Sequence, residues 1–309
     1  MDSNNSLVST VSVMQSEHFK FIFVQVLVAV FLCINFMLIT TFFTKEFFYT
    51  TMRYILFAVT LLSDCVILIV TNLLIICNYL KITMNLWLCA IMFILSTVYS
   101  SVTPFTLTAM TLERYVAICM PLRHGDLCST RCSLHCILLI HGLSSIHFIV
   151  DLSIYFASTS IKFYKQSMIC NVWIFILYRW QDHLRNAIKT LYFLFMCITI
   201  VFSYVRIMKA ARAASGEDRK STWKGLKTVI LHAFQLLLCL IQLWCPLIES
   251  AVLQTNVKAY INLRYVNYII FYVASRCLSP LIYGLRDEKF FCAMKSYLLC
   301  GFYKKNILI

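Results

Sequence analysis

The chain contains 309 residues, of which 61% are hydrophobic and only 13% are charged, and its mean hydropathy is +0.81. In a soluble protein of this size about a quarter of the residues are charged, because its surface faces water, so the composition excludes a soluble globular domain. Six glycines and four prolines are too few for the many turns of a β-barrel. The composition therefore predicts a helical membrane protein.

Charged residues divide the chain into seven long, almost uncharged stretches. A helix of about 20 apolar residues crosses the roughly 30 Å hydrocarbon core of a bilayer, and each stretch is read as one such span. The predicted spans are residues 21–44, 54–80, 82–112, 132–161, 190–205 with apolar extensions to 188 and 208, 228–248, and 265–285. Asp64, Asp151 and Arg276 lie within the second, fourth and seventh of them.

The distribution of the 27 Lys and Arg residues predicts the orientation of the chain. With the N-terminus outside, 17 of them fall on the cytoplasmic side and nine outside, as the positive-inside rule prefers. This topology explains the net charge of +14 without a nucleic-acid partner. Residues 1–19 then form an extracellular tail in which Asn4 is a candidate for glycosylation, and the first span is expected to act as an uncleaved signal anchor.

Most of the 15 cysteines lie in predicted spans or on the reducing cytoplasmic side, where disulfides are not expected. Cys77, Cys89 and Cys170 are near the outer face. A bridge between Cys89 and Cys170 would fix the loop after the fourth span over the bundle, whereas Cys77 is expected to be a small apolar residue. Metal-ligand spacing, phosphate-binding loops and nucleophile motifs are absent from the sequence, so we predict no enzyme activity, cofactor or metal.

A charged triplet, Glu113-Arg114-Tyr115, ends the third span 25 positions after Cys89, which is about 37 Å of helix. The segment ERYVAICMPLR that starts at Glu113 resembles the D/E-R-Y-VAIC-x-PL-R segment of rhodopsin-like (class A) G-protein-coupled receptors, in the form typical of odorant receptors. Further motifs of this family, over residues 20 to 300, match Asn35, Leu61-Leu62-Ser63-Asp64, Ser203-Tyr204, Trp244-Cys245-Pro246 and Ser279-Pro280-Leu281-Ile282-Tyr283. Mammalian odorant receptors usually have three cysteines in the second outer loop, whereas this chain has Cys170 alone. In this respect the chain resembles a divergent, fish-type branch of the family.

The resemblance implies an all-α membrane fold, a seven-transmembrane helix bundle followed by a short amphipathic C-terminal helix. It also implies a cytoplasmic switch in which Glu113 holds Arg114 in the resting state until a G protein is admitted. The residues implied in this switch are Glu113, Arg114, Tyr115, Tyr204 and Tyr283, and those implied as hinges are Trp244, Pro246 and Pro280.

A buried polar core is implied as well, formed by Asn35, Asp64, Arg276 and Ser279. In the family, the carboxylate that corresponds to Asp64 holds a sodium ion. Arg276 lies four residues before Pro280, so we expect its guanidinium to pair with Asp64 and to occupy the place of the ion. The alternative is an ion pair that only fixes the packing of the second and seventh spans.

The ligand pocket is expected in the outer half of the bundle. Its candidate residues are Phe93, Ser96, Thr97, Ser100, Ser101, Leu247, Ile248, Ala251, Tyr268, Ile269 and Tyr272. Ser96 stands where amine receptors have a carboxylate and Val273 where retinal-binding opsins have a lysine, so both subclasses are disfavoured. The lining favours a small, largely apolar ligand, although each residue could instead serve helix packing.

We therefore predict an odorant receptor of the plasma membrane with residues 20–286 as receptor domain and residues 287–309 as cytoplasmic helix and tail. Its expected partners are a small-molecule odorant, a heterotrimeric G protein of the cAMP-raising olfactory type, and membrane lipid. The lipid-facing side of the C-terminal helix is expected to comprise Phe290, Phe291, Met294, Tyr297 and Leu298, with Cys300 as a palmitoylation candidate. Alternatives are a non-olfactory receptor for a small lipid or metabolite and, more remotely, a transporter.

Overall fold

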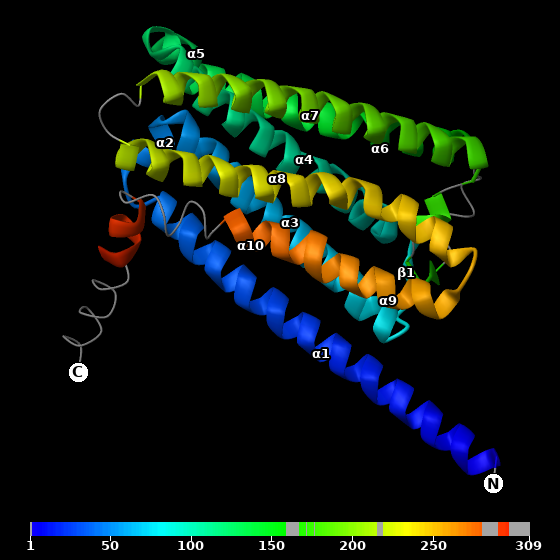
Figure 1. Cartoon of the computed structure of the whole chain (residues 1–309). Helices are drawn as coiled ribbons and strands as arrows, with labels where there is room; N and C mark the ends of the chain where they lie inside the picture. The colour runs from blue at the N-terminus through cyan, green and yellow to red at the C-terminus, as the bar shows by residue number, and fades with distance from the viewer. Residues whose placement is uncertain are drawn as a thin grey trace, which may run out of the picture.

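The computed structural model describes residues 2–158, 167–170, 172–175, 177–214, 219–279 and 290–296. Long helices lie side by side and run back and forth between two ends of the molecule (Figure 1). They are α1 (Asp2–Phe42), α3 (Met52–Tyr79), α4 (Leu86–Cys119), α6 (Thr130–Ser158), α7 (Arg179–Ala214) and α8 (Arg219–Leu253). A further rod consists of α9 (Val257–Asn267), the π-helix η4 (Tyr268–Val273) and α10 (Ala274–Ser279).

Short elements connect the long helices at both ends. At one end lie α2 (Glu46–Thr50), the 3₁₀ turn η1 (Pro121–Arg123) and α5 (His124–Leu127). At the other end, β1 (Met84–Asn85) pairs antiparallel with β2 (Ser167–Met168), and the 3₁₀ turn η3 (Val172–Phe175) follows. The sequence predicted neither strand, because two residues are too few to show an alternating pattern.

Within the described part of the chain, α1, α3, α4, α6, α7 and α8 each contain a segment that is long and apolar enough to cross a membrane. The seventh predicted span, residues 265–285, overlaps the rod of α9, η4 and α10 from residue 265 to residue 279, and its last residues lie outside the described part of the chain. Over its described residues, 257–279, this rod is divided by the π-helix, so it is not one continuous α-helix.

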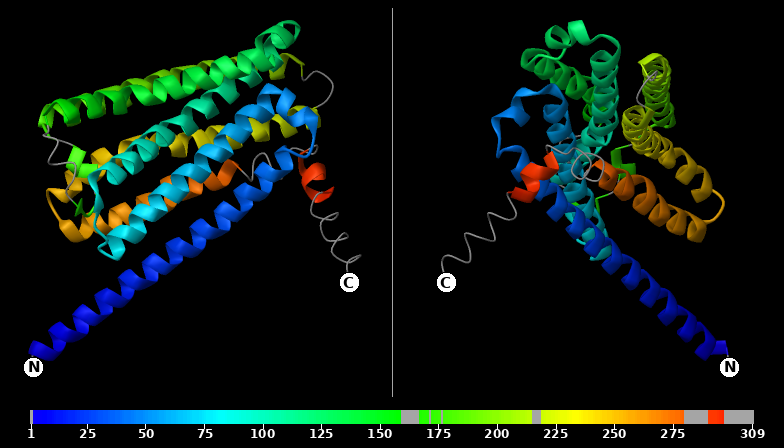
Figure 2. Two further views of the ribbon diagram at one scale, coloured as in Figure 1. Left: turned by 180° about the vertical axis from the view of Figure 1, so that it is seen from behind. Right: turned by 60° about the vertical axis from the view of Figure 1, so that its left-hand side comes forward.

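The helices extend beyond the uncharged stretches that predicted them. The start of α7 is Arg179 rather than residue 188, and the start of α8 is Arg219. Residues 2–19, which the sequence predicted to be a tail, continue α1, whose N-terminal part reaches beyond the other helices (Figures 1 and 2). The positions of charged residues delimit only the apolar part of a helix. The helix itself can extend further, because water can satisfy the backbone groups at its ends.

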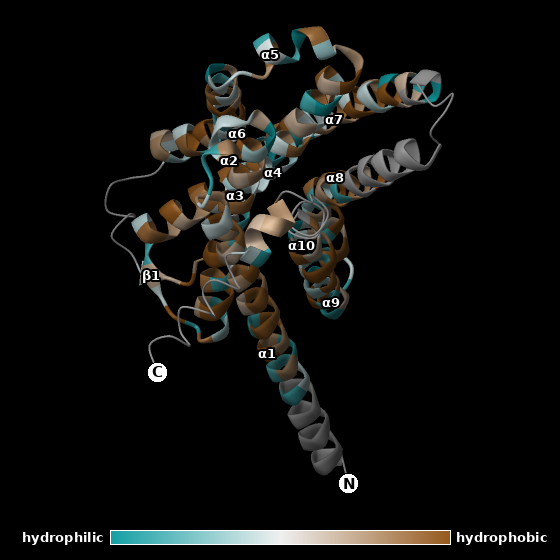
Figure 3. Ribbon diagram, turned by 90° about the vertical axis from the view of Figure 1, so that its left-hand side faces the viewer, coloured by the Kyte–Doolittle hydropathy of each residue, from teal (hydrophilic) through white to brown (hydrophobic). Residues whose placement is uncertain are grey.

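The core of the bundle is built around α4, which contacts α3, α6, α7 and α8. Leu56 and Leu61 of α3 and Val102 and Leu107 of α4 are fully buried there. Many large apolar side chains point outward instead, such as Ile198, which is 69% exposed. Figure 3 shows that hydrophobic residues dominate along the helices. An outward apolar surface of this extent fits a lipid environment and not water.

The C-terminal helical segment, residues 290–296, packs on the bundle. Phe290 is fully buried, and its ring centre lies 5.1 Å from that of Phe48 on α2. Met294 is buried as well, whereas Phe291 is 38% exposed. The predicted apolar face is therefore divided, because Phe290 and Met294 serve the protein core rather than the lipid. Tyr297, Leu298 and Cys300 lie outside the described residues.

The predicted disulfide is present. Cys89, near the start of α4, is bonded to Cys170, with the two Cα atoms 5.5 Å apart. Cys77 is a free thiol. Next to the bridge, the ring of Phe175 stacks on that of Phe93 at 4.7 Å between centres. The bridge, the two-stranded sheet and this ring pair together hold the loop after α6 over the bundle.

Replacing Cys89 or Cys170 by Ser is expected to lower the melting temperature and the surface expression of the protein together. Loss of a native disulfide costs about 2–5 kcal/mol, because the unfolded chain regains freedom. Cys77→Ser is the matched control and is expected to change neither quantity. Flow cytometry of intact cells and thermal melting measure the effects, and peptide mapping that finds Cys89 and Cys170 unbridged would contradict the assignment.

Candidate functional site

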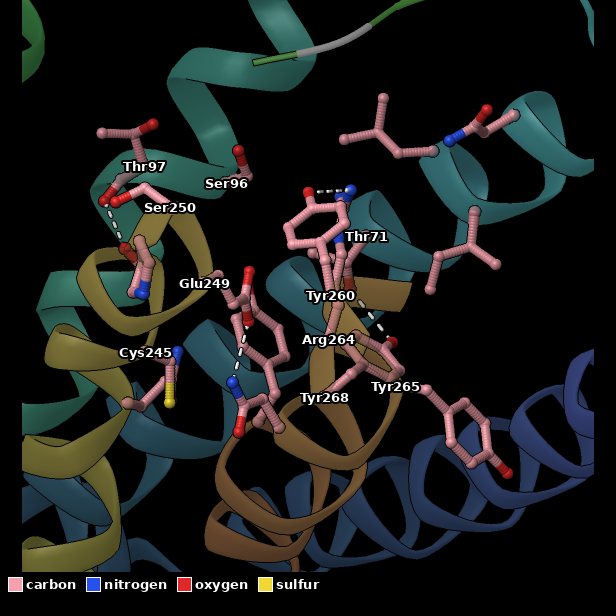
Figure 4. A pocket seen from close by; sticks show the side chains of 18 of the residues that line it. Thr71, Ser96, Thr97, Cys245, Glu249, Ser250, Tyr260, Arg264, Tyr265 and Tyr268 are labelled. Atoms are coloured by element: carbon pink, nitrogen blue, oxygen red, sulfur yellow. Dashed lines mark hydrogen bonds between the residues drawn. The ribbon is translucent and has the colours of Figure 1, made fainter. Parts of the chain in front are cut away.

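A cavity of about 690 Å³ opens in the bundle at the disulfide-bonded end. Eight of the sequence-predicted pocket and hinge residues line it: Phe93, Ser96, Thr97 and Ser100 on α4, Pro246 and Leu247 on α8, and Tyr268 and Tyr272 on η4. Figure 4 shows how Ser96 and Thr97 face the space on the α4 side, with Tyr268 across from them. The face that helical spacing predicted on α4 is therefore the face that bounds the cavity.

Four predicted pocket residues are not among those lining the cavity. Ser101 is buried in helix packing, Ile248 and Ala251 face outward, and Ile269 packs against an apolar cluster with Val24 and Leu68. The position of Ile269 away from the cavity is explained by the π-helix. A π turn contains more residues than an α turn, so it rotates the face that α-helical spacing predicts. Trp244 is half-exposed and contacts the Phe193 ring at 5.5 Å, so it too lies apart from the cavity.

Charged residues line the cavity as well, and the sequence analysis missed them. They are Glu17 and Lys20 on α1, Asp182, Arg185 and Lys189 on α7, Glu249 on α8, and Arg264 on α9. The candidate pocket residues named from the sequence are all uncharged, so these charged residues add to that set. The signal was present in Glu249, which lies three residues after Pro246 and just beyond the predicted end of the sixth span.

A buried ion pair anchors one wall of the cavity. Arg185 Nη2 of α7 lies 2.9 Å from Asp151 Oδ2 of α6, and Arg185 Nε donates to the same oxygen at 3.1 Å. Gln181 Nε2 donates to Asp151 Oδ1 at 3.5 Å and to the carbonyl oxygen of Phe175 at 3.0 Å. This network explains Asp151, the single charge in the fourth predicted span, and it ties the loop turn η3 to the helices.

The polar core lies deeper in the bundle, below the cavity. Arg276 of α10 is 2% exposed, and its Nε lies 3.4 Å from Oδ1 of the fully buried Asp64 on α3. Thr103 Oγ1 on α4 donates to the same carboxylate oxygen at 2.9 Å. Arg276 Nη1 donates to Gln242 Oε1 on α8 at 3.0 Å. The guanidinium therefore links α3, α8 and α10 through charge and hydrogen bonds.

The Arg276 guanidinium also stands 4.2 Å from the centre of the Tyr272 ring, in a cation–π geometry. Tyr272 in turn lines the cavity. Asn35 of α1 is buried, as expected for a core residue. Ser279 ends α10, but its side chain and Pro280 lie outside the description. The cavity and the polar core thus share one wall, formed by Tyr272.

The residues that the sequence predicted to form a switch lie at the opposite end of α4. Glu113 and Arg114 are both buried, and Tyr115 packs its ring 5.7 Å from that of Phe202 on α7. Glu113 Oε1 lies 3.4 Å from Nε2 of His124, the first residue of α5, a partner that the sequence analysis missed. Tyr204 of α7 packs against the main core, and Tyr283 lies outside the described residues.

A family model described as "7 transmembrane receptor (rhodopsin family)" matches residues 34–283, most of the chain. The chain belongs to the rhodopsin family of seven-transmembrane receptors. The receptor is 38% identical over 301 residues to "Odorant receptor 131-2" of Danio rerio, which covers 97% of this chain and 92% of that protein. It is 28% identical over 222 residues to "Galanin receptor 2a" of Danio rerio, covering 67% and 56% of the two chains. For "Olfactory receptor 6Q1" of Homo sapiens, the identity is 26% over 210 residues, covering 65% and 63%.

The prediction of a class A receptor with seven transmembrane helices is confirmed by this match. The rod of α9, η4 and α10 is accordingly the seventh span, and the receptor is a multi-pass membrane protein. The family consists of receptors rather than enzymes, in agreement with the expectation from the sequence motifs. A small-molecule ligand and a G-protein partner follow from membership in the family.

Proposed function

We propose that the protein is an odorant receptor of the plasma membrane, with an extracellular N-terminus, that activates a heterotrimeric G protein of the cAMP-raising type. The supporting observation is its similarity to Odorant receptor 131-2 over nearly the whole length of both chains. The cavity of about 690 Å³ is the candidate ligand site. Its volume lies within the range of about 300–1,000 Å³ that is usual for small-molecule pockets.

Few contacts connect the cavity with the polar core in the interior of the bundle. Tyr272 faces the cavity and carries Arg276 on its ring, and Arg276 is paired with Asp64. Pro246 and Leu247 bring α8 into contact with the same space. A ligand shifts the receptor toward the active state only if it binds the active state more tightly than the resting state. These cavity side chains are placed to contribute to that difference in affinity.

The function is tested by expressing the receptor in cells with a cAMP reporter and applying mixtures of volatile and water-soluble odorants. A response in cells that carry the receptor, and none in cells without it, is expected. The variant Ser100→Trp, which fills the cavity, should remove the response at equal surface density. Responses only to lipids or to non-odorous metabolites would contradict the olfactory assignment, and a response that persists in Ser100→Trp would contradict the cavity as ligand site.

The polar core leads to a separate expectation, that signalling of this receptor does not depend on sodium. The Arg276 guanidinium lies where it neutralises Asp64, so a free sodium ion has no uncompensated charge to bind. Basal and stimulated cAMP signals should therefore stay unchanged when sodium is exchanged for N-methylglucamine. Arg276→Ser is the comparison, since it removes the cation. Equal sensitivity of both forms to the exchange would show that Arg276 does not take the role of the ion.

A further inference from the structure

Four charged side chains line the cavity without an ion-pair partner among the described residues, and two of them, Asp182 and the exposed Arg264, are hydrogen-bonded to Asn186 and Tyr260. Among the charged lining residues, Lys20 is paired with Glu17 at 2.9 Å and Arg185 with Asp151 at 2.9 Å. Lys189 on α7 and Glu249 on α8 have no ion-pair partner among the described residues. Each is half-buried. They belong to two different helices that bound the same space.

The two acids that act electrostatically on Lys189, Asp151 and Asp182, are each in direct contact with another residue. Arg185, one turn earlier on α7, occupies Asp151 Oδ2 with two of its nitrogens, while Gln181 donates to Oδ1. Asp182, two turns before Lys189, accepts a hydrogen bond from Asn186 at 3.4 Å. The Lys189 ammonium has no hydrogen-bond acceptor within the described residues, so it is a cation open to a ligand on the α7 wall, which also contains Asp182.

Glu249 presents the opposite charge from α8. Its Oε1 accepts a hydrogen bond from Nδ2 of the buried Asn267 at 3.0 Å. This bond orients the carboxylate, and Figure 4 shows Glu249 reaching into the space between Ser96 on α4 and Tyr260 and Tyr268 on the opposite side. Amine receptors place their carboxylate where this chain has Ser96, and here α8 supplies a carboxylate to the same cavity instead.

An uncompensated charge in a partly dehydrated cavity is unfavourable, and a ligand group of opposite charge removes that cost. The lining also includes Phe93, Phe175 and Leu247, which suit an apolar ligand body. We propose that the receptor recognises small zwitterionic ligands, whose ammonium group binds Glu249 and whose anionic group binds Lys189. This inference rests on the proposed function of the cavity as ligand site. It retains the apolar body predicted from the sequence and adds a charge at each end.

The test uses purified receptor in detergent and four pools of linear compounds of about three to eight carbons, a range that fits the cavity. The pools are ω-amino acids, alkylamines, alkanoates and alkanols, applied at one shared concentration. The readout is the melting temperature, which rises with binding and needs no G protein. We expect the amino-acid pool to raise it by about 2–4 °C or more, and the other pools by less.

Variants then identify the two contacts. Glu249→Gln should raise the concentration of the amino-acid pool needed for half-maximal stabilisation at least tenfold and should abolish the effect of the amine pool. Lys189→Gln should do the same for the amino-acid and alkanoate pools. Glu46→Gln and Lys209→Gln are matched controls, because both residues are exposed and neither lines the cavity. Neither control should change the order of the pools.

The outcomes separate this inference from the proposed function. If alkanols stabilise as well as ω-amino acids, or if Glu249→Gln and Lys189→Gln leave the binding of ω-amino acids unchanged, the charge assignment is wrong while the cavity remains a ligand site. If stabilisation persists in the cavity-filling variant Ser100→Trp, the compounds bind elsewhere and the assignment is equally wrong. If no pool shifts the melting temperature, the inference is overturned, and the cAMP assay with odorant mixtures decides separately whether the proposed function stands.

Discussion

Replacing Arg276 by Met is expected to destabilise the receptor by about 3–5 kcal/mol, because it leaves the carboxylate of Asp64 buried without its cation. Asp64 is fully buried, and Thr103 is the hydrogen-bond donor that remains to it in the structure. The same substitution removes the hydrogen bond to Gln242 and the contact with the Tyr272 ring. Met keeps much of the volume of the side chain, so a cavity contributes little to the loss.

The measurement is the melting temperature of the purified receptor in detergent, for the single variants Arg276→Met and Asp64→Asn and for the double variant. If the two residues form one ion pair, the double variant should lose less than the sum of the singles. Arg206→Met is the matched control, because Arg206 is exposed, in the C-terminal part of α7. Its substitution should change stability by no more than about 0.5 kcal/mol. Strictly additive losses would show that the two groups do not stabilise each other.

Much of the fold follows from the sequence because a bilayer imposes a simple constraint. An apolar stretch of about 20 residues must form a helix, since lipid offers no partner for backbone groups. The stretches 54–80 and 132–161 accordingly lie close to α3 (Met52–Tyr79) and α6 (Thr130–Ser158). Helix ends beyond the apolar part, such as Arg179 of α7, escape this constraint, because water or headgroups satisfy the backbone there.

The cavity was predictable where helical spacing alone places residues on one face, as for Phe93, Ser96 and Ser100 of α4. It was not predictable where local geometry departs from an α-helix, as at Ile269 in the π-helix. The charged lining was missed for a different reason. Spans delimited by charges place most charges at their margins, so Lys189 fell at the outer edge of the fifth predicted span and Glu249 just beyond the sixth.

Pairings between distant residues needed the structure. Asp151 and Arg185 are 34 positions apart, and the sequence placed the first in a span and the second outside the membrane. Asp64 and Arg276 were expected to meet because a family motif aligned both of them with one site. No motif connected Asp151 with Arg185 or Glu113 with His124. Resemblance to a family thus predicts shared pairings, whereas those specific to this chain arise from packing.

Replacing Arg114 by Ala is expected to abolish stimulated cAMP production while ligand binding is retained. Arg114 lies 14 positions after Ser100 on α4, which is about 21 Å along the helix, so the substitution removes no contact with a ligand in the cavity. In the switch that the family resemblance implies, Glu113 holds Arg114 at rest, and the release of Arg114 admits the G protein. Loss of Arg114 should therefore reduce signalling to the level of cells without receptor.

Binding and signalling must be measured on the same variant to separate this role from a structural one. The odorant mixture that gives the largest response in the native receptor is applied to native and Arg114→Ala receptor at equal surface density, with cAMP and ligand-induced shifts in melting temperature as readouts. Arg131→Ala, which removes an exposed arginine near the start of α6, is the matched control. If Arg114→Ala signals normally, the residue is no switch. If it loses binding and signalling together, the buried Arg114 stabilises the helix bundle, because a residue at the far end of α4 can affect the cavity only through the packing of the helices between them.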